Sequence, residues 1–94
     1  MSNRVRTEFS ANMSDLKQAG NAFSLLSAWS AQQKQEGWTY HGCYISIQSE
    51  SNFTFNFLIV NETGLTKTQK EEVINTINRS GLKYFSFMVD PRPA

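Results

Sequence analysis

In the segment from Asn52 to Val60, every odd-numbered position carries a large apolar residue, and the first even-numbered positions are polar. The odd-numbered positions carry Phe53, Phe55, Phe57 and Ile59, and the even-numbered positions carry Thr54, Asn56, Leu58 and Val60. Because successive side chains of a strand point to opposite faces, this pattern is typical of a strand with one buried face and one polar face. We therefore predict a strand here, with its phenylalanines in the core.

The segment from Ser14 to Glu36 has helical spacing. Its apolar residues recur at steps of three and four positions, at Leu16, Ala19, Phe23, Leu26 and Trp29. Such spacing places them in one stripe along a helix. We predict an N-cap at Ser14, with Ser10 as the alternative, and a stop at Gly37. Gly20 lies beside the stripe, where glycine costs about 1 kcal/mol relative to alanine, and it predicts close packing against the sheet.

A second helix is predicted to begin at Thr66, because Thr66 and Gln69 have the spacing of a capping box. Its apolar face consists of Val73, Ile74 and Ile77. We expect the helix to stop at Gly81, since glycine readily adopts the left-handed backbone conformation that ends many helices.

Three further segments alternate in the manner of strands, at residues 3–9, 38–49 and 82–89. The first alternates weakly, so a frayed arm or an early start of the first helix is an alternative. The second is joined to the phenylalanine-rich strand by the short polar link Glu50–Asn52, which predicts a hairpin, and Gly42 is a candidate for a bulge. The run Asp90–Pro93 predicts the end of the last strand, because proline has no N–H group to donate.

The resulting order, β-α-β-β-α-β, predicts an α+β ferredoxin-like sandwich. Two helices would cover one face of an antiparallel sheet with the strand order 4-1-3-2. The alternation gives one inward-facing set, namely Val5, Phe9, Ile45, Ile47, Phe53, Phe55, Phe57, Ile59, Phe85 and Phe87. We expect Trp29 and Trp38 to close this core, and a single domain over residues 1–94. If residues 3–9 form no strand, the fold reduces to α-β-β-α-β with three strands.

The opposite face of the predicted sheet would be open. Its candidate binding residues are Arg4, Arg6, Tyr40, Tyr44, Gln48, Asn56, Tyr84 and Ser86. Tyrosine and arginine are enriched at protein interfaces, and they also suit single-stranded nucleic acid, in which bases stack on aromatic rings. A face that simply meets water is the alternative, since strand-favouring residues include tyrosine and threonine.

The phenylalanine-rich strand resembles, over about eight residues, the central octapeptide of the RNA-recognition-motif family. Phe53 and Phe55 have the spacing of that family's stacking aromatics. However, Ser51 stands where the family has a basic residue, and Thr54 and Asn56 stand at positions that are apolar in the family. Exposing the phenylalanines would bury two polar side chains, which is costly, so we predict that the phenylalanines are core and do not assign the chain to this family.

The composition of the chain argues against several classes of function. The net charge is +1, from nine basic and eight acidic residues, which argues against a basic nucleic-acid-binding tail and against an acidic nucleic-acid mimic. Cys43 is the only cysteine and His41 the only histidine, too few for a cysteine-based zinc site. No catalytic or cofactor motif is present, so we predict neither an enzyme nor a cofactor. A lone cysteine favours the cytoplasm, and no apolar run is long enough for a membrane.

We therefore expect a small non-catalytic protein-binding module, such as an inhibitor, antitoxin or adaptor of the kind that phages and mobile elements encode. It would act through the open sheet face and would also self-associate as a homodimer, because an edge strand can pair with its copy. The alternative is a single-stranded RNA- or DNA-binding protein or a small nuclease of the same fold, for which Glu8 and Asp90 are the only acidic candidates at strand ends.

Overall fold

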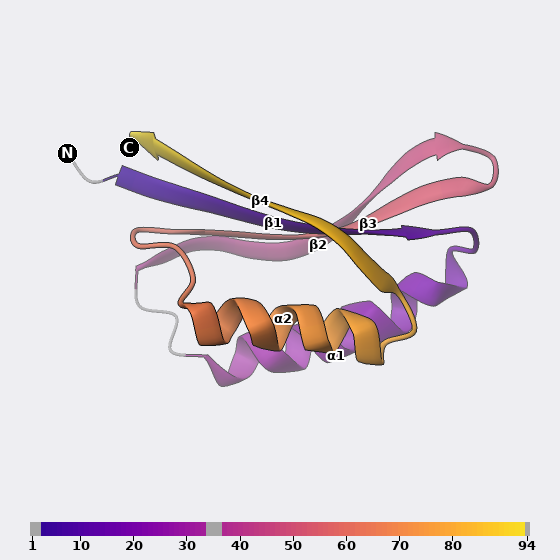
Figure 1. Ribbon diagram of the computed structural model, residues 1–94, viewed down its shortest axis with the longest axis horizontal. Helices are drawn as coiled ribbons and strands as arrows, with labels where there is room; N and C mark the ends of the chain where they lie inside the picture. Colours follow the sequence, from indigo (N-terminus) through magenta and orange to yellow (C-terminus); the bar gives the residue numbers. More distant parts are fainter. Residues whose placement is uncertain (1–2, 34–36, 94) are drawn as a thin grey trace.

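The computed structural model describes residues 3–33 and 37–93, and it describes only the backbone of Asn3, Tyr84, Phe85, Phe87 and residues 91–93. The elements are β1 (Asn3–Met13), α1 (Lys17–Gln32), β2 (Trp38–Ser49), β3 (Asn52–Asn61), α2 (Lys67–Arg79) and β4 (Lys83–Pro93). The strands form one antiparallel sheet in the order β2-β3-β1-β4, and both helices cover the same face of it (Figure 1). This is the predicted α+β ferredoxin-like arrangement, with β1 and β3 in the centre.

The centre of the core is the inward face of β3. Its side chains Phe53, Phe55, Phe57 and Ile59 are all buried, as the alternation predicts. The register places Phe57 between Phe9 of β1 and Cys43 of β2, and the ring of Trp29 from α1 meets Phe57 edge-on with centroids 6.1 Å apart. Each fully buried phenylalanine contributes roughly 1.5–3 kcal/mol of transfer free energy, so this row of side chains is the main apolar contact between the sheet and the helices.

The first strand is longer than predicted, and this delays the start of α1. β1 continues to Met13, so neither Ser10 nor Ser14 caps the helix. Leu16 precedes the first helical residue and makes no side-chain cap. Instead, the amide N–H groups of Ser14 and Asp15 donate to Oε1 of Gln18. The predicted stop at Gly37 is also wrong, because Gln33 already has an extended backbone and ends the helix four residues earlier.

The buried stripe of α1 is rotated relative to the predicted one. The buried residues are Ala19, Ala22, Leu26, Trp29 and Ser30. Phe23 and Leu16, which were predicted to be part of the stripe, are 55% and 49% exposed. Both lie at the flank of the buried stripe, because the helix turns the small residue Ala22 towards the core and leaves Phe23 at the edge that faces β2. The sequence pattern alone therefore placed two apolar side chains in the core that lie at its margin.

The second helix follows the prediction closely. Thr66 Oγ1 accepts a hydrogen bond from the Gln69 amide at 3.1 Å, and the Thr66 amide donates to Gln69 Oε1 at 2.9 Å, which completes the capping box. Val73 and Ile77 are buried, and Ile74 packs partly buried against the core. This apolar face holds α2 over the β1 and β4 side of the sheet.

The last strand does not stop at its prolines. β4 runs to Pro93, with Pro91 opposite Val5 and Pro93 opposite Asn3 of β1. β4 is an edge strand, and every second N–H group of an edge strand points away from the sheet, where proline costs no ladder bond. Two prolines that are two residues apart fit this geometry, so the predicted termination at Asp90–Pro93 is wrong.

The helices are too short to cover the whole sheet. A helix of 16 residues is about 24 Å long, whereas strands of 11 and 12 residues reach about 36–40 Å. Figure 1 shows the β2–β3 hairpin and the paired ends of β1 and β4 rising away from the helices at opposite ends. Ile45 and Ile47, which were predicted to be core, are consequently exposed, and Ile47 reaches 71%.

Gly20 does not mark close packing, contrary to the prediction, because a Cβ atom added there would meet nothing within 4 Å. We expect Gly20→Ala to raise the free energy of unfolding by about 0.5–1 kcal/mol, the difference in helix propensity. Urea denaturation followed by circular dichroism measures this change.

Gly81 provides a matched control for this substitution. An added Cβ at Gly81 also has open space, but its φ of +96° is strained for any residue with a side chain. Gly81→Ala should therefore destabilise the protein by roughly 1 kcal/mol, and a loss of stability in Gly20→Ala would show that the glycine is required where it stands.

Candidate binding surfaces

The open face of the sheet carries a connected charged network. The Tyr44 hydroxyl of β2 donates a hydrogen bond across β3 to Oε2 of Glu8 in β1, and Arg6 Nη2 forms an ion pair with the same oxygen at 3.3 Å. The hydrogen bond to the Glu8 carboxylate raises the pKa of the Tyr44 hydroxyl, with burial adding to the effect. These contacts fix one predicted tyrosine and one predicted arginine relative to each other.

A second, uncharged network lies in the row beside it. Asn56 of β3 stands opposite Tyr44 and Ser10 in the register and is only 4% exposed. Its Oδ1 accepts from the Ser10 hydroxyl at 2.8 Å, and its Nδ2 donates to Ser46 Oγ at 3.2 Å and to the Thr54 carbonyl at 3.1 Å. Its amide is therefore used within the sheet, where it fixes the neighbouring side chains.

A bulge in β2 places Trp38 and Tyr40 on opposite faces of the sheet. The register shifts between Trp38 and Tyr40, so Trp38 lies on the helix side, with its ring 6.2 Å from that of Trp29, while Tyr40 lies over Gly42. A Cβ at Gly42 would be 2.8 Å from the Tyr40 hydroxyl. The two tryptophans close the core as predicted, Gly42 hosts no bulge, and Tyr40 remains 48% exposed.

The remaining predicted binding residues are spread across the face. Arg4 is exposed on β1, and Ser86 is exposed opposite Ser10. Gln48 is exposed at the irregularity between Ile47 and Ser49, next to the hairpin turn. The side chain of Tyr84 lies outside the described residues, and the register shift between Ser10 and Ala11 interrupts the alternation between Tyr84 and Ser86.

Met88 is a further exposed residue of this face that lies outside the predicted binding set. It stands opposite Glu8 in the register and is 54% exposed. Its neighbour Val89 stands opposite the buried Thr7, on the helix side of the same strand. Alternation in β4 placed Met88 on the open face, but methionine is not among the residue types that first suggest a binding surface.

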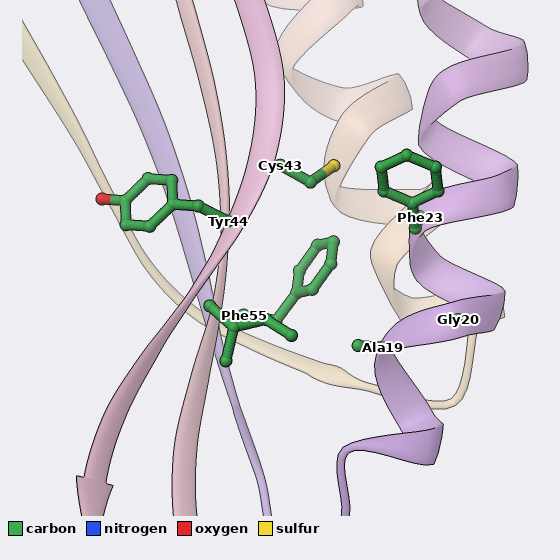
Figure 2. Close-up of a pocket in the computed structure, with 7 residues that line it drawn as sticks. Ala19, Gly20, Phe23, Cys43, Tyr44 and Phe55 are labelled. Carbon is green, nitrogen blue, oxygen red and sulfur yellow. The ribbon is translucent and has the colours of Figure 1, made fainter.

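An apolar groove of about 350 Å³ lies between α1 and β2, on the other side of the sheet. It is lined by Ala19, Gly20, Phe23, Cys43, Tyr44, Ile45 and Phe55. Figure 2 shows Cys43 and Phe23 approaching each other across the groove and the Phe55 ring forming its floor, while the Tyr44 ring points away from α1. Sequence reasoning missed this groove because it assigned Phe23 and Ile45 to a closed core.

Cys43 and His41 do not form a catalytic pair. Burial raises the pKa of the Cys43 thiol to about 12, so the thiol is protonated at neutral pH and is a poor nucleophile. His41 instead packs edge-on against the Trp38 ring, with centroids 5.6 Å apart. Within residues 3–33 and 37–93, no group of three His, Cys, Asp or Glu side chains is placed to hold a metal ion.

No described helix is long and apolar enough to cross a membrane.

No family model matches the chain, and no curated protein matches it either. Among solved structures, it is similar to the C-terminal domain of the MgtC protein from Mycobacterium tuberculosis, with a TM-score of 0.57 and 9% identity over 96% of this chain and 87% of that one. It is also similar to LarC2, the C-terminal domain of a cyclometallase involved in the synthesis of the NPN cofactor of lactate racemase, with a TM-score of 0.48 and 11% identity over 96% of this chain and 56% of that one. At 9% identity, the likeness to the MgtC domain shows the α+β fold alone.

The position of Cys43 in the groove predicts low thiol reactivity. Because the thiolate is the attacking species, we expect the folded protein to react with Ellman's reagent at pH 8 at least roughly tenfold more slowly than the unfolded chain. Stopped-flow absorbance with and without guanidinium chloride measures both rates, and equal rates would contradict a buried thiol.

The raised pKa also predicts a pH dependence of stability. The folded state holds the thiol proton more tightly than the unfolded chain, whose pKa is the usual 9.0. The stabilisation is therefore complete below pH 9 and is lost as the pH rises from 9 towards 12. Urea denaturation at pH 8 and at pH 10.5 measures this effect. Between these two pH values, the free energy of unfolding should fall less in Cys43→Ala than in the wild-type protein.

Proposed function

We propose that this chain is a non-catalytic protein-binding domain that contacts its partner through the open face of the sheet. The observation that supports this most is the pair of exposed tyrosines, Tyr40 and Tyr44, with Met88 on a face that neither helix covers. Large side chains of this kind, set among polar neighbours, are the usual anchors of protein interfaces.

The hydrogen bonds of this face favour binding in a second way. Tyr44 is held by Glu8, and Glu8 is held by Arg6, while Asn56 bonds to both flanking strands. Side chains that are ordered before binding lose less conformational entropy when a partner docks. The face therefore offers a preorganised centre with Tyr40 and Met88 as exposed anchors on either side.

A domain of this size and chemistry would act as an inhibitor, antitoxin or adaptor in the cytoplasm, of the kind that phages and mobile elements encode. The single cysteine is consistent with a reducing compartment. The position of Glu8 favours a protein partner over nucleic acid, since its carboxylate lies in the centre of the face and forms the ion pair with Arg6. A phosphate backbone would have to compete with that carboxylate for the Arg6 guanidinium.

Two adjacent residues of β4 give a matched test of this proposal. Met88 lies on the open face and Val89 on the helix side, and they are 54% and 43% exposed. Met88→Lys should lower the amount of partner that the tagged protein captures from a native lysate by about 10- to 30-fold, the loss expected of one interface anchor. Val89→Lys should leave capture unchanged, as measured by quantitative mass spectrometry.

Equal capture by the wild-type protein and the Met88→Lys variant would contradict the proposed face. Capture of nucleic acid that weakens steeply with salt would replace the proposal by the single-stranded RNA- or DNA-binding alternative. Circular dichroism of both variants controls for the fold, because both positions are already exposed to water.

A further inference from the structure

Charge is distributed unequally between the two sides of the molecule. The elements α1 and β2 together contain one charged residue, Lys17. The elements α2 and β4 contain eight, namely Lys67, Lys70, Glu71, Glu72, Arg79, Lys83, Asp90 and Arg92. Depletion of charge is what distinguishes the centre of a protein interface from the rest of a surface. The α1–β2 side therefore shares this depletion of charge with the centre of an interface.

The two edges of the sheet differ in the same way. β4 carries Asp90 and two prolines, which are the usual means of preventing another strand from pairing with an edge. β2 is the other edge, and none of its twelve residues from Trp38 to Ser49 is a proline or a charged residue. β4 is therefore protected against pairing, whereas β2 is open to it over the regular segment from Tyr40 to Ile47, between its two register irregularities.

Exposed apolar side chains lie along the open edge. Ile45 and Ile47 of β2 point to the helix side of the sheet but are 39% and 71% exposed, and Phe23 of α1 is 55% exposed. Ile45 and Phe23 also line the groove between β2 and α1. The backbone edge and the apolar strip beside it would be covered together by one strand and its side chains.

We propose that β2 pairs antiparallel with β2 of a second copy of this chain, so that two sheets join into one of eight strands. A two-fold axis pairs a strand with itself, and an uncharged strand meets its own copy without like-charge contacts in any register. The grooves of the two copies then face each other beneath the two α1 helices, and the second copy completes the wall that each groove lacks.

The size of this side fits a stable dimer. A strand of 12 residues is about 40 Å long, and a sheet with one helix layer is roughly 20 Å deep. The flat outline of the α1–β2 side is therefore on the order of 800 Å² for each copy, large enough to bury the accessible area of about 800 Å² per partner that specific interfaces use. Both copies would also place their open faces on the same side of the joined sheet, although the proposal does not depend on the function of that face.

Ile47→Lys tests this inference, with Val89→Lys on the opposite edge as the matched control. Sedimentation equilibrium of the wild-type protein should give twice the chain mass of 10.7 kDa, and Val89→Lys should give the same. Ile47→Lys should give the mass of one chain, because an inward-pointing lysine at an edge prevents strand pairing. Since Ile47 is already 71% exposed, the monomer should keep its fold.

Hydrogen exchange of the wild-type protein tests the geometry without any substitution. In a β2–β2 dimer, the outward-pointing amides of β2 are protected at high concentration and exchange faster on dilution, whereas those of β4 exchange fast throughout. A monomeric wild type, a dimer that survives Ile47→Lys, or unprotected β2 amides in a dimer would each overturn the proposal. Loss of partner capture in Met88→Lys with an intact dimer would separate the open face from this interface.

Discussion

Burial of the inward face of β3 is the interaction on which the rest of the structure depends. Phe55, Phe57 and Ile59 are almost completely removed from water, and they contact inward residues of the strands on both sides as well as the helices. Because β1 and β3 are the central strands, the phase of β3 sets the phase of its neighbours through the register. The polar side of the same strand, with Asn56 at its centre, becomes the middle of the open face.

A difference in length between the two layers shapes the surface. The helices cover the middle of the sheet, and the long strands continue beyond them at both ends (Figure 1). At the β2 edge this leaves apolar side chains next to an unprotected backbone, and α1 adds Phe23 to that strip. The groove and the exposed isoleucines therefore follow from the difference in length between the helices and the strands. The apolar, uncharged character of this edge follows from the composition of α1 and β2.

Patterns among neighbouring residues were enough to predict the fold. Parts of the binding surfaces depend instead on contacts between distant elements, which the sequence did not reveal. Alternation in β3 and the capping box at Thr66 depend only on neighbouring residues, and both are confirmed. The rotation of α1 depends on how small residues such as Ala22 pack into the core, which no helical periodicity reveals. The bulge before Tyr40 and the paired prolines of β4 follow from edge geometry. The sequence also did not indicate that Thr7 is fully buried. Its hydroxyl has no hydrogen-bond partner among the described residues.

The whole fold requires that the phenylalanines of β3 point at the helices and not at the open face. Nuclear Overhauser contacts between aromatic rings in solution test it most directly. The structure predicts cross-peaks between the Phe57 ring and the Trp29 indole, whose centroids are 6.1 Å apart. Cross-peaks from the Phe55 and Phe57 rings to the Glu8 and Ser10 side chains of the open face, with none to α1, would contradict this orientation of β3.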